Sequence, residues 1–260
     1  MNLSCCIWSL PGPEPENLSH IAELGYTWID IQPHMLAGDR RVLARELGLA
    51  VSCVGAAFGM PAGASLDGAE PDAVRPALDH LDRSFSRAAS LGATVAYVIP
   101  GTDTSPNALN RYAESINKAA EMAAGAGLKL CIEHFPGRAL PTAEDTLNFI
   151  KNISHPNLYL LYDSGHVQMS NEPPATTIKQ AGSLLGYVHF DDNDGEADLH
   201  WALLDGVMTE ASLRETFAAL EEIGYNGSVS LELNQTLPDP LDVLTRSTKI
   251  INAIGGRYWQ

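Results

Sequence analysis

The amino-acid sequence predicts an α/β protein that folds as one (β/α)8 barrel. Apolar, β-branched segments alternate with amphipathic segments along the chain, which is typical of strands and helices joined in parallel βα units. Eight such units can be counted, the number that closes a barrel, and 260 residues is a typical length for one barrel domain. We therefore expect a single domain that spans residues 1–260.

The individual elements follow from short apolar runs for strands and from amphipathic runs for helices. We expect strands at 3–10, 27–32, 50–58, 93–99, 129–134, 158–163, 186–191 and 227–233. We expect helices at 15–25, 39–48, 71–91, 106–127, 142–152, 172–184, 209–223 and 239–255.

Several helix boundaries carry local signals. Thr142 stands where its side chain can cap the fifth helix. Glycines follow the helices at the position that favours a left-handed backbone, namely Gly25, Gly48, Gly92, Gly127 and Gly224. Two long loops, 59–70 and 192–208, follow the third and seventh strands, and we expect both to cover the mouth of the barrel as lids or specificity loops.

The charge balance limits the partners. The chain has 32 acidic and 16 basic residues, a net charge of −16, whereas proteins that bind nucleic acids need basic residues to neutralise phosphates. The composition, with 45% hydrophobic and 18% charged residues, is that of a globular protein. We expect a small-molecule ligand or a metal, and no nucleic acid.

Cysteine usage and the N-terminus suggest the compartment. The four cysteines lie in expected strands without CxxC spacing, so we expect reduced core residues at Cys5, Cys6, Cys53 and Cys131. The N-terminus lacks the basic and apolar regions of a secretory signal, and no long apolar window predicts a membrane span. A cytoplasmic location without a membrane partner is the expectation.

Four metal-binding side chains stand at or near the ends of the last four expected strands. They are Glu133, Asp163, His189 and Glu232. In a barrel, these ends meet on the face where active sites lie. Three carboxylates buried together strongly disfavour ionisation unless a cation is present, and this donor set suits Mn²⁺ or a similar ion. We expect a divalent metal, with Mn²⁺ first and Mg²⁺, Co²⁺ or Zn²⁺ as alternatives.

Other polar residues lie near these strand ends. His166, on the loop after the sixth strand, is a candidate to contact substrate. His134 follows Glu133, so alternation along the strand points its side chain away from the metal. Asp198 and His200, in the second long loop, form a further metal-type pair, although loop carboxylates are also common in turns.

Aromatic residues near the same face predict an apolar wall. Trp8 ends the first expected strand, Phe58 ends the third, and Trp201 lies in the second long loop. Such a wall stacks on the less polar face of a sugar or keeps water from the site.

The chain resembles the xylose-isomerase-like TIM-barrel superfamily, specifically the sugar phosphate isomerase/epimerase group with its ketose 3-epimerases, hydroxypyruvate isomerase and inosose dehydratase. The motifs that carry the resemblance are IEH, YDSGH, VHFDD with the following D-x-H pair, and LEL. The resemblance implies that Glu133, Asp163, His189 and Glu232 hold the metal, while His166 touches substrate. Two substrate-binding positions of the epimerases differ, with Ala139 in place of a glutamate and Gly195 in place of an arginine.

The resemblance implies an isomerase or epimerase that acts on a sugar or a related polyol ketone through an enediolate. Glu133 and Glu232 are the expected proton-transfer residues, and His166, His200, Trp8 and Phe58 the expected substrate contacts. Except for Arg138 after the fifth strand, no basic cluster or phosphate loop lies near the strand ends, which favours an unphosphorylated substrate.

Three alternatives stay open from the sequence. A dehydratase or lyase acting on a keto-sugar or keto-inositol shares the first proton-transfer step. An endonuclease IV-like enzyme with three zinc ions requires histidines after the second and third strands, where His34 matches and Phe58-Gly59 does not. A non-catalytic sugar-binding subunit uses the same fold. A homo-oligomer is also open.

Overall fold

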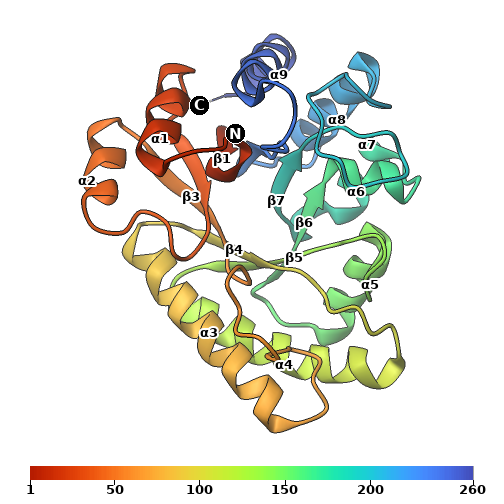
Figure 1. The fold of residues 1–260 in the computed structure, drawn as a ribbon. Coiled ribbons are helices and arrows are strands. Elements are labelled where there is room, and N and C mark those ends of the chain that lie inside the picture. Colours follow the sequence, from red (N-terminus) through yellow and green to blue (C-terminus); the bar gives the residue numbers. More distant parts are fainter. Residues whose placement is uncertain (260) are drawn as a thin grey trace.

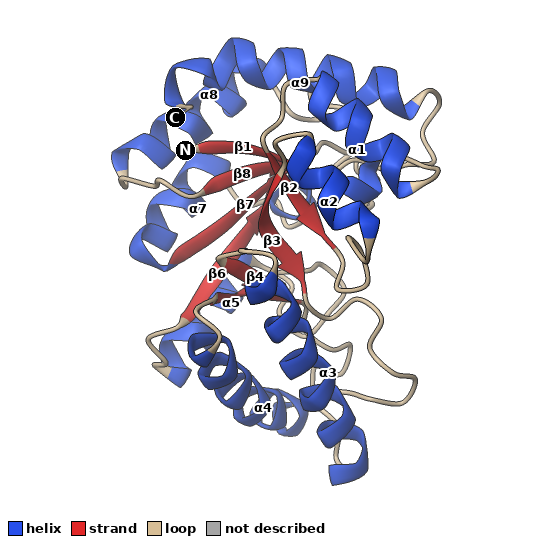
Figure 2. Cartoon of the chain, turned by 90° about the vertical axis from the view of Figure 1, so that its left-hand side faces the viewer, coloured by secondary structure: helices blue, strands red, loops and turns tan. Residues whose placement is uncertain are grey.

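The structure is a computed structural model that describes residues 1–259. Within these residues, eight parallel strands pair in chain order and close into a barrel, with β8 returning to β1 (Figures 1 and 2). The strands are β1 (Asn2–Cys6), β2 (Trp28–Ile31), β3 (Ala50–Gly55), β4 (Val95–Val98), β5 (Lys129–Glu133), β6 (Leu158–Asp163), β7 (Leu185–Phe190) and β8 (Ser228–Leu231). The expected (β/α)8 fold is confirmed.

Helices lie around the outside of this barrel (Figure 2). They are α1 (Glu14–Glu23), α2 (Asp39–Glu46), α3 (Pro71–Ser90), α4 (Pro106–Gly125), α5 (Ala143–Ile153), α6 (Ser164–Met169), α7 (Pro174–Ala181), α8 (Glu210–Glu222) and α9 (Pro240–Gly255). Three short 3-10 helices occupy Ile7–Ser9, Gly182–Leu184 and Gly256–Tyr258. No helix in the described part of the chain is long and apolar enough to cross a membrane.

Three expected segments differ from the structure. The strand expected at 50–58 ends at Gly55, and Phe58 lies in the turn that follows. The strand expected at 3–10 ends at Cys6, because neither neighbouring strand pairs with the chain beyond that residue, and a 3-10 turn carries Trp8 instead. The expected loop after β6 is helix α6, which places His166 on a helix. The side chain of Asp163 accepts a hydrogen bond from the His166 backbone N–H at 2.8 Å and caps this helix.

The predicted helix boundaries hold where a specific interaction fixes them. Thr142 accepts a hydrogen bond from the backbone N–H of Asp145 and caps α5. The five glycines expected after helices all have a positive φ, between 70° for Gly224 and 89° for Gly25, a conformation that glycine adopts without a Cβ clash.

The barrel interior holds a compact cluster that mixes thiols and aromatic rings. It consists of Cys53, Val95, Tyr97, Cys131, Leu161 and Tyr187, all buried. The four cysteines are buried, and none forms a disulfide within the described residues, as the sequence predicts. This interior layer forms the floor on which the polar residues at the C-terminal strand ends are held.

Candidate active site

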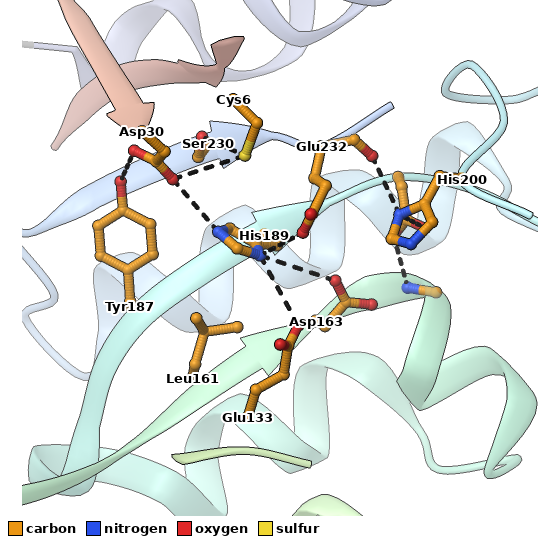
Figure 3. A network of polar contacts seen from close by, with 12 residues as sticks. Cys6, Asp30, Glu133, Leu161, Asp163, Tyr187, His189, His200, Ser230 and Glu232 are labelled. Carbon is orange, nitrogen blue, oxygen red and sulfur yellow. Dashed lines mark hydrogen bonds and ion pairs between the residues drawn. The ribbon is translucent and has the colours of Figure 1, made fainter. Parts of the chain in front are cut away.

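The four metal-type side chains converge at the C-terminal ends of β5 to β8. Each of them offers one ligand atom, and these atoms all lie within 4.8 Å of one another (Figure 3). The Nδ1 atom of His189 lies 2.7 Å from Glu232, 3.8 Å from Glu133 and 4.0 Å from Asp163. The strand-end pattern in the sequence therefore does bring these residues together.

This cluster has the properties of a cation site. Within residues 1–259, Asp163 Oδ2 is buried without a hydrogen-bond partner, which is rare for polar atoms inside proteins, and His189 Nδ1 faces all three carboxylates of the cluster. Burial, together with the negative charges of Asp191 and Glu133, raises the pKa of Asp163 to about 8. A bound divalent cation relieves both conditions, and three carboxylates with one imidazole are ligands that Mn²⁺-type ions accept.

A cavity of about 250 Å³ adjoins the cluster. Its lining residues are Gly55, Ala57, Phe58, Tyr97, Ile99, Glu133, Phe135, His166, His200 and Glu232. Of the four metal-type residues, Glu133 and Glu232 line the cavity and are 5% and 9% exposed, whereas Asp163 and His189 are fully buried. The two glutamates are therefore the members of the cluster that a small molecule can reach.

An aromatic pair stands beside Glu232. The indole Nε1 of Trp8 donates a hydrogen bond to Glu232 Oε1 at 2.8 Å, and the Trp8 ring packs on Phe58 with centroids 5.4 Å apart. Although burial opposes it, the contacts with His189, His200 and Trp8 lower the pKa of Glu232 to about 2. Of the expected aromatic wall, Phe58 lines the cavity, whereas Trp8 packs on Phe58 outside the described lining.

Trp201 does not belong to this wall, so that part of the prediction is wrong. Its backbone pairs with Asp192 in an isolated bridge, which folds the start of the long loop back on itself. The Trp201 side chain lines a separate surface hollow with Leu237 and Arg246.

His166 and His200 reach the cavity from α6 and from the long loop. Asp198 lies between them, 3.5 Å from His166 Nε2 and 3.0 Å from His200 Nε2, and Asp191 lies 3.0 Å from His200 Nδ1. Burial disfavours the His166 imidazolium, but Asp163, Asp198 and Glu133 outweigh burial and raise its pKa to about 10. Asp191 and Asp198 likewise raise the pKa of His200 despite its burial.

His134 lies behind this group and does not line the cavity. Its Nδ1 is 3.4 Å from the Leu161 carbonyl oxygen, and its ring packs edge-on against His166. Burial and the neighbouring His166 lower the pKa of His134 to about 3.

The structure adds residues that the sequence does not single out. Tyr97 and Ile99 from the end of β4, and Phe135 just after β5, line the cavity, and Phe135 packs on His166 at 4.3 Å between ring centroids. Their signal in the sequence is only their position at strand ends. Asp30 of β2 is fully buried and lies 3.2 Å from His189 Nε2.

Other candidates lie away from the cavity. Arg138 donates a hydrogen bond to the Pro100 carbonyl at 3.2 Å and lies over the Phe135 ring, outside the lining. His34 is exposed on the loop after β2. A trinuclear zinc site of the endonuclease IV type requires additional histidines from β2 and β3. Among the described residues, no histidine from either strand belongs to the four-residue cluster.

Comparisons with known proteins identify the family and the fold. A family model described as xylose isomerase-like TIM barrel matches residues 18–251. A D-psicose 3-epimerase of Ruminiclostridium cellulolyticum is 29% identical over 129 residues, which cover 47% of this chain and 40% of that protein. An inosose dehydratase of Yersinia enterocolitica is 25% identical over 165 residues, covering 56% and 55%. The chain thus spans about half the length of the curated relatives it matches.

The fold has counterparts among solved structures. A D-allulose 3-epimerase from Methylomonas sp. superposes with a TM-score of 0.83 at 18% identity, over 97% of both chains. An L-ribulose 3-epimerase superposes with a TM-score of 0.82 at 22% identity, over 97% of this chain and 93% of that one. At this level of identity, the likeness concerns the fold.

Proposed function

The chain belongs to the xylose isomerase-like TIM barrel family, and we propose that it is a divalent-metal-dependent isomerase or epimerase of a ketose sugar or a related polyol ketone. The observation that carries the proposal is that two residues of the four-residue cluster line a cavity and the other two are fully buried. Glu133 and Glu232 face a cavity of small-molecule size, while Asp163 and His189 are buried behind them. The curated psicose and ribulose 3-epimerases among the relatives support the same reaction class.

In this proposal, Glu133, Asp163, His189 and Glu232 hold the cation, with Mn²⁺ as the first candidate and Mg²⁺, Co²⁺ and Zn²⁺ as alternatives. When bound, a divalent cation polarises a carbonyl group and its neighbouring hydroxyl and makes the adjacent C–H bond more acidic. The unpartnered buried Oδ2 of Asp163 supports this assignment.

The proton is transferred by the two glutamates that line the cavity. The indole N–H of Trp8 donates to Glu232 and favours its ionised form, so this carboxylate is available to accept a proton from carbon. Glu133 reaches the same space from β5 and serves as the second proton carrier. Removal on one face and return on the other gives an epimer, whereas return to the adjacent carbon gives an aldose–ketose isomer.

The cavity supports a neutral substrate. Among its described lining residues there is no lysine or arginine, which is the usual partner of a phosphate group. Phe58, Ile99 and Phe135 provide apolar walls, and the Trp8 ring packs on Phe58 in a tilted arrangement. His166 and His200 supply the hydrogen-bonding groups that orient hydroxyl or carbonyl oxygens.

Dehydration is the second candidate, because one observation favours it. His166 faces the cavity, and Asp163, Asp198 and Glu133 raise its pKa to about 10 despite its burial, so its imidazolium can donate a proton to a departing hydroxyl. The inosose dehydratases among the relatives support this reaction. It uses the same first step, in which a glutamate removes a proton from carbon.

The two candidates are distinguished by incubation of the chelated and Mn²⁺-reconstituted protein with neutral ketoses and inososes in D₂O. We expect Mn²⁺-dependent deuterium incorporation next to the carbonyl and a product of the same composition as the substrate. A product lighter by one water assigns the dehydratase. A metal-loaded protein that exchanges no carbon-bound proton on any member of the panel refutes the proton-transfer function.

A further inference from the structure

We propose that Asp30 is a positioning residue of the metal site, because it fixes which nitrogen of His189 faces the cation. This inference rests on the proposed metal site. His189 lies between two sets of carboxylates, with Nδ1 toward the four-residue cluster and Nε2 at 3.2 Å from Asp30 Oδ2 (Figure 3). A neutral imidazole carries one N–H, and a carboxylate at Nε2 keeps the proton there. The Nδ1 lone pair is then free for the metal.

Asp30 is itself held by hydroxyl groups from three other strands. Its Oδ1 accepts hydrogen bonds from Ser4 at 2.9 Å, from Tyr187 at 2.6 Å and from Ser52. All three donors are buried, and they come from β1, β7 and β3. With Oδ1 occupied in this way, the carboxylate cannot rotate freely, and Oδ2 stays directed at His189.

A purely structural role does not explain this arrangement. An apolar side chain at the centre of the barrel fills space without a desolvation penalty, whereas a buried carboxylate needs several hydrogen bonds to be tolerated. Five side chains surround Asp30, namely three hydroxyl groups, the Cys6 thiol at 3.7 Å from Oδ2 and the imidazole of the metal cluster. Of these contacts, the one with His189 links Asp30 to the proposed metal site.

The ring of His189 is also fixed in orientation. Tyr97 and Tyr187 pack edge-on against it, with centroids 5.4 Å and 5.5 Å away and interplanar angles of 89° in both cases. The tyrosines therefore hold the plane of the imidazole, and Asp30 selects the protonated nitrogen within that plane.

The test compares metal affinity in three variants of the full chain by Mn²⁺ titration. Asp30→Asn keeps the size of the side chain but cannot accept hydrogen bonds on both atoms, and we expect the Mn²⁺ dissociation constant to rise about 10- to 100-fold. Tyr187→Phe removes one donor to Asp30, so a smaller rise is expected. Tyr112→Phe removes a buried hydroxyl in α4 that has no hydrogen-bond partner among the described residues, and this variant should bind Mn²⁺ as the wild type does.

A spectroscopic readout separates positioning from general destabilisation. In the Zn²⁺-loaded wild type with ¹⁵N-labelled histidine, we expect His189 to carry its proton on Nε2, and this signal should shift or exchange faster in Asp30→Asn. Wild-type affinity in Asp30→Asn overturns the inference but leaves the proposed function standing. If Asp30→Asn does not fold, a Tyr187→Phe variant indistinguishable from Tyr112→Phe overturns it instead. A wild type that binds no divalent metal refutes the proposed function as well.

Discussion

The buried imidazole of His134 makes the stability of the protein depend on pH in a predictable direction. In the folded protein, burial and the neighbouring His166 lower the pKa of His134 to about 3, whereas an unfolded histidine titrates near its ordinary value of 6.5. Between these two values the unfolded chain binds more protons than the folded chain. The contribution of His134 to the free energy of unfolding is therefore fully present above about pH 6.5 and is lost as the pH falls below that value.

The magnitude follows from the same two values. At pH 5.0 an unfolded histidine is almost fully protonated and the folded one is not, which favours unfolding by about 2 kcal/mol relative to pH 7.5. His134→Asn keeps a side-chain N–H near the Leu161 carbonyl but has no titratable group, so this contribution disappears. Between pH 7.5 and pH 5.0, the free energy of unfolding should therefore fall by about 2 kcal/mol less in the variant than in the wild type.

The assay is urea denaturation at pH 7.5 and pH 5.0 with a chelator present, so that metal binding does not contribute. His34→Asn, which replaces an exposed histidine, is the matched control and should follow the wild type. If His134→Asn and the wild type lose equal stability between the two pH values, the assignment of a neutral, buried His134 is refuted.

Three further predictions follow from the site and the loop above it. Mn²⁺ at about 100 times its dissociation constant should stabilise the fold by about 2.7 kcal/mol and raise the melting temperature by roughly 5–10 °C, and an unchanged melting curve contradicts the cation site. Glu133→Gln and Glu232→Gln should each slow carbon-proton exchange by about 100-fold or more with the circular dichroism spectrum preserved, and full activity in both rules out the proposed proton carriers. Gly206→Ala should destabilise the protein by about 1–3 kcal/mol, because its Cβ would lie 2.0 Å from the Asn193 carbonyl oxygen. Gly125→Ala, whose Cβ meets no atom within 4 Å, is the control for that measurement.

The strand-end residues of the site could be predicted because their position depends only on topology. Once the alternation of elements predicts a closed parallel barrel, Glu133, Asp163, His189 and Glu232 must share one face. The capping residues and the glycines after helices were equally predictable, since their signals are local in sequence.

Asp30 could not be predicted, because its role depends on long-range register. In the pairing between β2 and β3, Ile29 lies opposite Val51 and Asp30 opposite Cys53, so Ser52 has no partner in β2, and its hydroxyl donates to Asp30. Alternation within a four-residue strand does not reveal such a shift. The partners of Asp30 are serine and tyrosine residues from three other strands, which have no common motif.

The loop residues show the same limit. Trp201 was predicted to line the cavity from its aromatic character, but the bridge between Asp192 and Trp201 determines where its side chain lies. Ile99 and Phe135 line the cavity, yet in the sequence they are indistinguishable from core residues. Side-chain contacts across loops depend on backbone hydrogen bonds that a one-dimensional pattern does not encode.

The central claim is that four residues at the ends of β5 to β8 bind one divalent cation. The most direct measurement is the metal content of the purified protein and of an Asp163→Asn variant, followed by Mn²⁺ titration of the chelated chains. We predict about one ion per wild-type chain and a strongly weakened site in the variant. A wild type that binds no divalent metal, or a variant that retains wild-type affinity, would contradict the claim.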